Sequence, residues 1–267
     1  MYPTERRDSI ISILSKKDIV KVSDLSESMG VSESSIRRDL RGLEREGIVQ
    51  LFYGGAKLTD NAKAVMSRPY TERTALNAHE KILIARKAMT LIEEGECILL
   101  DAGSTTAALA YELREYHRRL TVVTTAPNIA LILKSNPYIS VILTGGLLRT
   151  PGESLIGELA EATLDRLHIS KAFVGAAGIV MENDDTGDDM HVMYGNLLEG
   201  QVRKKILETI PDVTVLADHT KFGRKALVAV FSIAFAQCVV TNKAIPAEYL
   251  DWLTKSGVRT VIADNAS

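Results

Sequence analysis

The stretch from Val22 to Gly47, VSDLSESMGVSESSIRRDLRGLEREG, decides the fold of the N-terminal part of this chain. Within it Ile36, Leu40 and Leu43 recur at i, i+4 and i+7, the spacing that gathers apolar side chains on one face of a helix. Gly47 is placed to end this helix, because glycine readily takes the left-handed conformation found beyond helix ends. The stretch therefore predicts a helix that packs through one face and leaves the other exposed.

Signals on either side extend this helix into a small domain. Ser23 can cap a preceding short helix, Gly30 ends it, and Ser32 caps the helix that follows. An earlier helix is predicted from Glu5 to Lys16, and IVQLFYGGAKL, residues 48–58, predicts a hairpin that pivots near two glycines. This order of elements predicts a winged helix-turn-helix, which is a DNA-binding fold.

The polar face of the main helix carries serines at its start and arginines along its length. A helix in the major groove presents such short polar and long cationic side chains to bases and phosphates. A merely solvated face is the alternative for an arginine-rich helix, but the surrounding winged-helix pattern favours DNA. The predicted DNA-binding residues are Ser34, Ser35, Arg37, Arg38, Arg41, Tyr53, Gly54 and Gly55.

Net charge does not reveal a nucleic-acid partner. Residues 1–57 carry ten Lys and Arg against nine Asp and Glu, and the whole chain has a formal net charge of −2. The cations that bind DNA must therefore be concentrated on one face of the N-terminal domain.

Composition indicates a globular protein with two unequal domains, since 267 residues with 46% hydrophobic content can form a sizeable core. No apolar run is long enough to span a bilayer and residues 1–8 are polar, so we expect a cytoplasmic protein with no membrane partner. Cys97 and Cys238 lie in apolar runs without nearby metal ligands. We expect buried thiols, no metal and no cofactor.

The second domain is predicted to be α/β, with a largely parallel sheet covered on both faces by helices. We expect the DNA-binding domain at 1–57, a linker at 58–75 and an effector-sensing domain at 76–267, which opens with a helix over 77–94. Its predicted strands are 97–101, 120–125, 139–145, 171–178, 213–218, 238–242 and 259–264.

A ligand site is predicted where three of these strands end. The stretch from Asp101 to Thr106, DAGSTT, joins a strand to a helix, and free N–H groups at such a helix start bind phosphate. ILTGG at 142–146 and LADHTKFG at 216–223 end strands at the same edge, where Lys221 supplies a charge and Asp101 or Asp218 can accept sugar hydroxyls. A capped turn and an exposed loop lysine are the alternatives.

The chain resembles the DeoR family of bacterial sugar-metabolism regulators through residues 22–47, YGGA, DAGSTT, LTGGLLR and LADHTKFG. The resemblance implies a sensor fold related to pentose-phosphate isomerases, a phosphorylated sugar effector, double-stranded operator DNA as partner, and a homodimer or homotetramer. The strand-end motifs and this resemblance together predict the effector-binding residues, which are Asp101, Gly103, Ser104, Thr105, Thr106, Gly145, Gly146, Arg149, Glu199, Asp218 and Lys221.

Two positions and one segment depart from the family pattern. Ser35 stands where threonine is usual, and Leu51 stands where the family commonly has a wing arginine, so one phosphate contact is expected to be missing. Residues 181–194, MENDDTGDDMHVMY, are unusually acidic; a flexible acidic loop is favoured over a metal site.

These observations predict a DNA-binding transcriptional repressor of a sugar-catabolism operon, controlled by the phosphorylated sugar, and not an enzyme. The alternative is a sugar-phosphate isomerase-like enzyme that carries an interaction domain. Isomerisation needs a carboxylate base, which VGAAGI at 174–179 lacks, although Asp101, Glu199 and Asp218 remain open as bases. A protein-binding adaptor is a third possibility, against which the arginine face argues.

Overall fold

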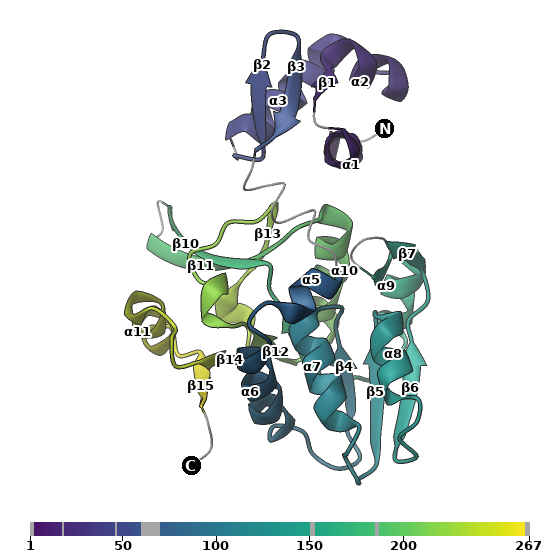
Figure 1. Cartoon of the computed structure of the whole chain (residues 1–267), viewed down its shortest axis with the longest axis vertical. Coiled ribbons are helices and arrows are strands. Elements are labelled where there is room, and N and C mark those ends of the chain that lie inside the picture. The colour runs from purple at the N-terminus through teal and green to yellow at the C-terminus, as the bar shows by residue number, and fades with distance from the viewer. Residues whose placement is uncertain are drawn as a thin grey trace. The chain divides into compact units, whose positions relative to one another are not determined.

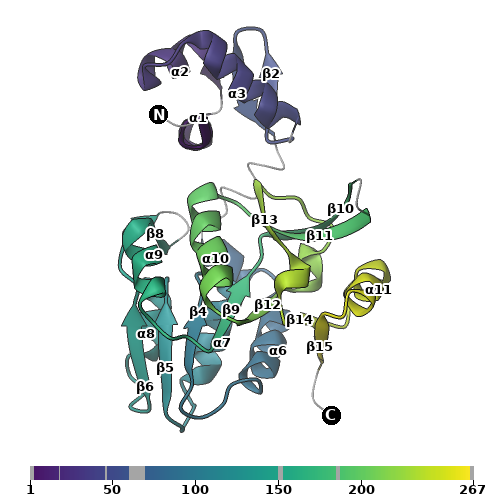
Figure 2. The same ribbon diagram turned by 180° about the vertical axis from the view of Figure 1, so that it is seen from behind.

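The computed structural model describes residues 3–17, 19–45, 47–59, 70–149, 153–184 and 187–264. The chain divides into two compact units, the first formed mainly by the N-terminal residues up to Thr59 and the second by those from Tyr70 onward. Figures 1 and 2 show the elements of each unit from two opposite sides. Each unit is described separately below.

The first unit is a winged helix-turn-helix, as predicted. Its three strands form an antiparallel sheet in the order β1-β3-β2, and Tyr53 and Gly54 make the turn of the β2–β3 hairpin. Ile36, Leu40 and Leu43 are buried, so the predicted apolar face of the main helix is confirmed. The elements are α1 (Pro3–Lys16), β1 (Val20–Lys21), α2 (Val22–Met29), α3 (Glu33–Arg45), β2 (Val49–Phe52) and β3 (Gly55–Leu58).

In the first unit, the predicted caps at Gly30 and Ser32 are confirmed, and the predicted cap at Ser23 is not. Gly30 takes the left-handed conformation at the end of α2, with φ 61°, and the backbone N–H of Ser35 donates to Ser32 Oγ over 3.4 Å at the start of α3. Ser23, however, does not cap α2. The strand β1 runs directly into this helix, which begins at Val22, so Ser23 lies inside its first turn.

The second unit is built on a seven-stranded parallel sheet in the order β15-β14-β12-β9-β4-β5-β6. All seven predicted strands belong to it, because each is a short apolar run that can be buried on both faces. They are β4 (Cys97–Leu100), β5 (Leu120–Thr124), β6 (Ile139–Leu143), β9 (Lys171–Gly175), β12 (Asp212–Leu216), β14 (Cys238–Asn242) and β15 (Arg259–Ala263).

Two apolar clusters cover the two faces of this sheet. One contains α6 (Ala78–Met89), α7 (Ser104–Leu113) and α8 (Pro127–Leu133), which lie in front of the sheet in Figure 1. The other contains α9 (Glu158–Asp165), α10 (Leu197–Thr209) and α11 (Ala247–Lys255). Figure 2 shows α9 and α10 on this second face. The predicted helix over 77–94 is shorter than expected and ends at Met89.

The structure adds elements that were not predicted. Residues 181–194 are not a flexible loop where they are described, because β10 (Gly178–Asp184) and β11 (Gly187–Tyr194) pair antiparallel, and β13 (Val228–Ser232) extends the same sheet. A second antiparallel pair is β7 (Leu147–Arg149) with β8 (Ser154–Ile156). Short 3-10 turns span His219–Lys221 (η1) and Ile233–Phe235 (η2).

The expected linker over 58–75 contains regular structure at both of its ends. Tyr70–Ala75 forms the helix α5, and Leu58 belongs to β3, while residues 60–69 lie outside the described part of the chain. Within the described part, no helix combines the length and apolar content needed to cross a membrane.

Candidate functional site

Helix α3 is held in the first unit by apolar packing and by a partly buried ion pair. Asp39 lies on its packed side and accepts from Arg6 of α1, with Nε to Oδ2 at 2.5 Å and Nη2 to Oδ1 at 3.2 Å. Two parallel bonds between a guanidinium and a carboxylate fix orientation as well as distance. They fix the rotation of α3 against α1 and so determine which side chains face solvent.

The predicted DNA-binding side chains of α3 lie on its exposed side. Arg37, Arg38, Arg41 and Ser34 are exposed, and Ser35 is half-buried. Arg37 pairs with Glu33 one turn earlier, over 2.8 Å, with both side chains about half exposed. An exposed pair of this kind is weak, so it leaves the Arg37 guanidinium available to another anion.

The wing requires its two glycines for different reasons. Gly54 has φ 81°, a conformation that favours glycine in a tight hairpin. At Gly55 a Cβ atom would lie 2.7 Å from the carbonyl oxygen of Val20, so β1 approaches too closely for any side chain. Tyr53 at the tip is fully exposed, whereas the backbone N–H of Leu51 donates to Glu44. Tyr53 is thus the side chain that the wing tip offers to a partner.

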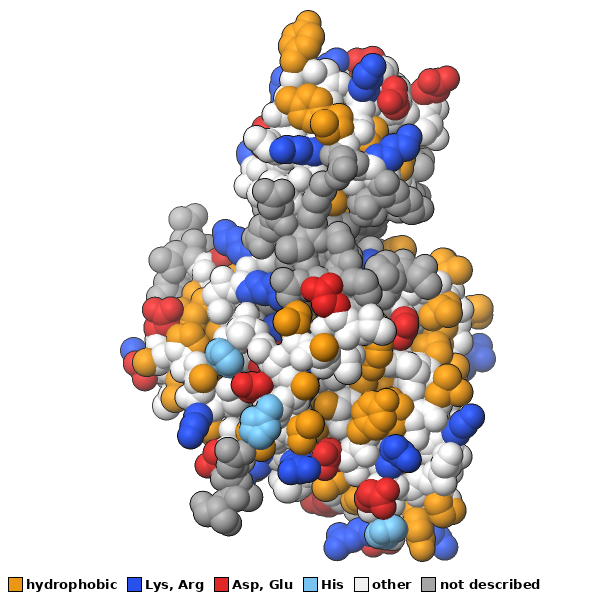
Figure 3. All heavy atoms as spheres, viewed as in Figure 1, with side chains coloured by type: hydrophobic (Ala, Val, Ile, Leu, Met, Phe, Trp, Pro, Cys, Tyr) orange, Lys and Arg blue, Asp and Glu red, His pale blue; other side chains and the backbone are white. Residues whose placement is uncertain are grey.

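Charges of both signs are mixed on the surface of the first unit. On the visible face of this unit, Figure 3 shows Lys and Arg side chains interspersed with acidic ones. Any binding of polyanions must therefore depend on the local arrangement of α3 and the wing.

In the second unit, the three predicted strand ends do open on one edge of the sheet, because β4, β6 and β12 run parallel. After β4, Gly103 precedes α7 and is partly exposed, as is Ser104. Thr105 and Thr106 are buried, and the Thr106 hydroxyl donates to the carbonyl oxygens of Asp101 (2.6 Å) and Gly103 (3.0 Å). Thr106 therefore stabilises the loop itself, and Gly103 and Ser104 are its accessible part.

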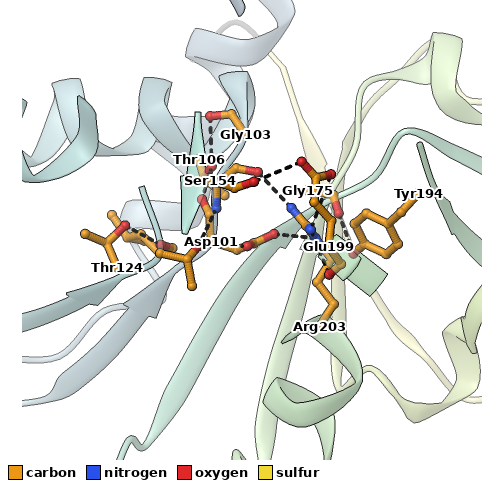
Figure 4. A network of polar contacts seen from close by, with 12 residues as sticks. Asp101, Gly103, Thr106, Thr124, Ser154, Gly175, Tyr194, Glu199 and Arg203 are labelled. Atoms are coloured by element: carbon orange, nitrogen blue, oxygen red, sulfur yellow. Dashed lines mark hydrogen bonds and ion pairs between the residues drawn. The ribbon is translucent and has the colours of Figure 1, made fainter. Parts of the chain in front are cut away.

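Asp101 is 1% exposed and is bound within the protein, as Figure 4 shows. One carboxylate oxygen accepts from Thr125 (3.1 Å), and the other lies 2.8 Å from Nε of Arg203 on α10. Arg203 also donates to the carbonyl oxygens of Glu199 (2.9 Å) and Ala102 (3.1 Å). Its guanidinium carbon lies 4.4 Å from the ring centre of Tyr194. Asp101 thus anchors Arg203, and its predicted contact with a sugar hydroxyl remains a prediction.

Glu199 extends this arrangement to the β7–β8 hairpin. Its Oε1 atom accepts from Arg149 (2.8 Å) and from the Ser154 hydroxyl (2.9 Å), and its Oε2 atom lies 3.6 Å from Arg203. Burial alone raises the pKa of Glu199, but Arg203, Arg149 and Ser154 outweigh it and hold the pKa below its usual value. Two predicted residues, Glu199 and Arg149, are thereby joined to Asp101 through Arg203.

The turn after β6 contains the predicted glycines. Gly145 and Gly146 have φ 76° and 114°, and a Cβ atom at Gly146 would lie 2.6 Å from the carbonyl oxygen of Ile156. Gly145 is exposed and the Thr144 side chain is buried. These glycines let β6 turn sharply into β7, which carries Arg149.

The loop after β12 brings Asp218 and Lys221 together with residues from α6 and the turn before it. Asp218 is 1% exposed, and its Oδ1 atom accepts from the Asn77 side chain (3.1 Å) and the Thr220 backbone (3.0 Å). Burial lowers the pKa of Lys221 to about 8, opposed by Asp218 and assisted by nearby Arg224, Lys81 and Arg73. A lysine with this pKa is cationic at neutral pH and poorly hydrated, which suits it to bind an anion.

Arg73 connects the two groups of charges. Burial lowers its pKa, and it interacts electrostatically with Glu199, Arg203 and Arg149 as well as with Lys221. The predicted charged residues of all three strand ends therefore belong to one electrostatic neighbourhood.

Sequence reasoning did not single out Arg203, Tyr194, Asn77 or Lys81 as site residues. The i, i+4 spacing of Glu199 and Arg203 was a visible signal, but such pairs are usual on exposed helices. In the described residues, no group of His, Cys, Asp and Glu is arranged to hold a metal ion.

A winged helix-turn-helix unit combined with an α/β unit that gathers charged side chains at its strand ends defines a ligand-responsive DNA-binding regulator. Comparisons with known proteins identify the family. Residues 6–62 match the DeoR-like helix-turn-helix domain, and residues 76–243 match the DeoR C terminal sensor domain. The chain belongs to the DeoR family of transcriptional regulators.

Two curated relatives show how far the similarity extends. The HTH-type transcriptional regulator GolR of Listeria innocua is 34% identical, over 94% of this chain and 96% of its own length. The glycerol-3-phosphate regulon repressor of Escherichia coli is 30% identical, over 95% of this chain and 96% of its own length.

Similarity to solved structures is more limited. Ribose 5-phosphate isomerase A of Methanocaldococcus jannaschii matches 56% of each chain, with 20% sequence identity and a TM-score of 0.40.

Proposed function

We propose that this regulator represses a sugar-catabolism operon and that a phosphorylated sugar, bound at the strand ends of the sensor unit, changes its affinity for operator DNA. The observation that carries the proposal is the excess of cations over carboxylates at this edge. Among the described residues, the five cations of Arg73, Lys81, Arg149, Arg203 and Lys221 interact with the carboxylates of Asp101, Asp218 and Glu199 and, in the case of Lys81, of Glu80. An anion restores the balance of charge there.

Lys221 and the start of α7 support a phosphate at this edge. Lys221 is half-buried and cationic at neutral pH. Gly103 and Ser104 stand at the beginning of a ten-residue helix, where backbone N–H groups and the helix dipole favour negative charge. Gly145, in the turn before β7, supplies exposed backbone. Arg149, at the end of β7, supplies a further guanidinium group.

Asp218 supports recognition of a sugar hydroxyl. Its Oδ2 atom is buried and has no hydrogen-bond partner among the described residues. A buried carboxylate oxygen that lacks a donor is costly. A hydroxyl of the ligand supplies that donor.

An enzyme is disfavoured by the same geometry. Asp101 and Glu199 are paired with arginine, and Asp218 accepts three bonds through Oδ1 from Asn77 and Thr220. A general base needs a carboxylate that can take a proton from the substrate. Arg203, Arg149 and Ser154 hold the pKa of Glu199 below its usual value, which makes it a weak base. Burial raises the pKa of Asp101, but its carboxylate is already engaged by Arg203 and Thr125.

For the first unit we propose that α3 enters the major groove, with Ser34, Ser35, Arg37, Arg38 and Arg41 at the DNA and with Tyr53, Gly54 and Gly55 at the wing. We further propose that the protein acts in the cytoplasm as a homodimer or homotetramer, because paired winged helices read repeated half-sites. Functional boundaries at 1–57, 58–75 and 76–267 belong to the same proposal.

A two-stage experiment tests the proposal. The purified protein is first screened by thermal shift against fructose 6-phosphate, glucosamine 6-phosphate, glycerol 3-phosphate and inorganic phosphate. Binding to DNA from upstream of its own gene is then measured with each compound that raises the melting temperature. We expect a sugar phosphate to stabilise the protein and to change its DNA affinity; turnover of that sugar phosphate at enzyme-like rates contradicts the proposal.

A further inference from the structure

Asn77 has an unusual backbone conformation at the junction between helices α5 and α6. It stands between α5, the first described helix after residues 60–69, and α6, with φ 49° and ψ 41°. Among the described residues only Asn77 and Glu153 have positive φ without being glycine. Asparagine tolerates this left-handed conformation better than most side chains. The direction in which α5 leaves α6 is therefore set at Asn77.

The Asn77 side chain joins this junction to the loop that follows β12. Its amide nitrogen donates to Asp218 Oδ1 (3.1 Å) and to Thr220 Oγ1 (3.0 Å). The Thr220 backbone N–H and hydroxyl also donate to Asp218 Oδ1. The Oδ1 atom of Asp218 thus accepts hydrogen bonds both from the α5–α6 junction and from the loop after β12.

Lys81 secures α5 on the other side of the junction. Its side chain is 3% exposed, and its ammonium group donates to the carbonyl oxygens of Arg73 and Leu76 at the end of α5. Burial lowers the pKa of Lys81, and the charge of Asp218 opposes that shift. Both groups that fix α5, the Asn77 amide and the Lys81 ammonium, consequently interact with Asp218.

Asp218 is also the residue whose Oδ2 atom is buried without a hydrogen-bond partner among the described residues. From this shared carboxylate we infer that Asn77 is a positioning residue that couples occupancy of the effector site to helix α5. The inference rests on the proposed function, since it assigns the regulation of the same site. A ligand can change the placement of α5 only if its affinity differs between two arrangements. The Asn77–Asp218 hydrogen bond is made in one arrangement of α5 and lost in the other, so the affinity of Asp218 for the ligand differs between them.

The coupling follows from competition for one carboxylate. A ligand hydroxyl that donates to Oδ2 reduces the negative charge available to the Asn77 amide and the Lys81 ammonium, and an anion beside Lys221 attracts the Lys81 ammonium away from Asp218. The attachment of α5 to the loop weakens, and the helix that follows residues 60–69 changes its equilibrium position. Asn77 acts on DNA binding through this helix, without contact to DNA.

Asn77→Gly separates this role from a purely structural one. Glycine accepts the left-handed backbone without strain, so the fold is retained while both side-chain bonds are lost. Full-length wild-type and variant proteins are titrated with the sugar phosphate that gives the largest thermal shift, and operator affinity is measured with and without it. We expect the change in operator affinity to fall from at least about fivefold in the wild type to less than about twofold in Asn77→Gly.

Controls make each outcome informative. Lys243→Ala removes an exposed cation that follows β14 at the same sheet edge and is expected to respond as the wild type does. Asn77→Asp replaces the donor by a carboxylate beside Asp218 and is expected to lose the response too. The ligand-induced thermal shift of Asn77→Gly is expected to persist.

Three results separate the hypotheses. A full operator response in Asn77→Gly overturns the inference and leaves the proposed function intact. Loss of the ligand-induced thermal shift in Asn77→Gly also overturns it, because Asn77 then serves binding and not coupling. A wild-type protein that responds to none of the sugar phosphates contradicts the proposed function itself.

Discussion

Arginine has opposite uses in the two units of this protein. On α3, Arg37, Arg38 and Arg41 extend into solvent, where their charges are available to a partner. In the sensor unit, Arg203 is 4% exposed. Its guanidinium group pairs with the Asp101 carboxylate and lies over the ring of Tyr194. The comparison teaches that an arginine whose guanidinium is already enclosed by protein partners stabilises the structure, whereas one that extends into solvent keeps its charge for a partner.

Substitution of Arg203 is expected to have the largest effect on stability. Arg203→Met leaves Asp101 and Glu199 buried without their main counter-charge, which should lower the free energy of unfolding by about 3 to 5 kcal/mol. Urea unfolding of the whole protein measures this. Arg86→Met is the matched control, because Arg86 pairs with Glu112 at the surface, and is expected to cost less than about 1 kcal/mol. Equal losses in the two variants refute the distinction between buried and exposed arginine.

Substitution of Arg37 is expected to act on DNA and not on folding. Arg37→Ala removes an exposed guanidinium that pairs only weakly with Glu33, and should weaken operator binding by about 1 to 3 kcal/mol if it contacts a base. Fluorescence anisotropy with operator and with unrelated duplex measures both affinity and specificity. Unchanged operator affinity removes Arg37 from the interface.

Lys221 provides a prediction with a pH dependence. Its pKa is lowered to about 8 by burial, so the charged form that binds an anion predominates below pH 8 and is lost as the pH rises. Between pH 7 and pH 9 the Kd for the sugar phosphate should increase about tenfold. Calorimetric titration at both pH values tests this.

The Lys221→Ala variant sharpens the same point. It should abolish the effector response and leave operator affinity without effector unchanged, whereas Lys243→Ala should behave as the wild type does. A Lys221→Ala protein that responds normally shows that the anion binds elsewhere.

The parallel sheet was predictable because each of its strands is an apolar run such as CILL or CVVTN, and helical patterns between them require parallel connections. The hairpin at 178–194 was missed although a signal existed. Met190 and Val192 are buried and His191 between them is half-buried, the alternation of a strand. The many acidic residues nearby concealed this pattern.

The candidate site was predictable only in part. Strand ends in a parallel sheet meet at one edge, so the positions of Asp101, Gly145 and Asp218 followed from the sequence. The pairing of Asp101 with Arg203 joins residues far apart in the chain, and it depends on how α10 packs on the sheet. No local spacing encodes that contact, which is why Arg203 was assigned no role.

The most direct test of a ligand-controlled DNA-binding protein is its affinity for DNA upstream of its own gene, measured over a range of salt concentrations with and without the stabilising sugar phosphate. The account predicts specific binding that weakens steeply with salt and that changes at least about fivefold when the sugar phosphate is present. Equal affinity for that DNA and for unrelated duplex at every salt concentration contradicts it.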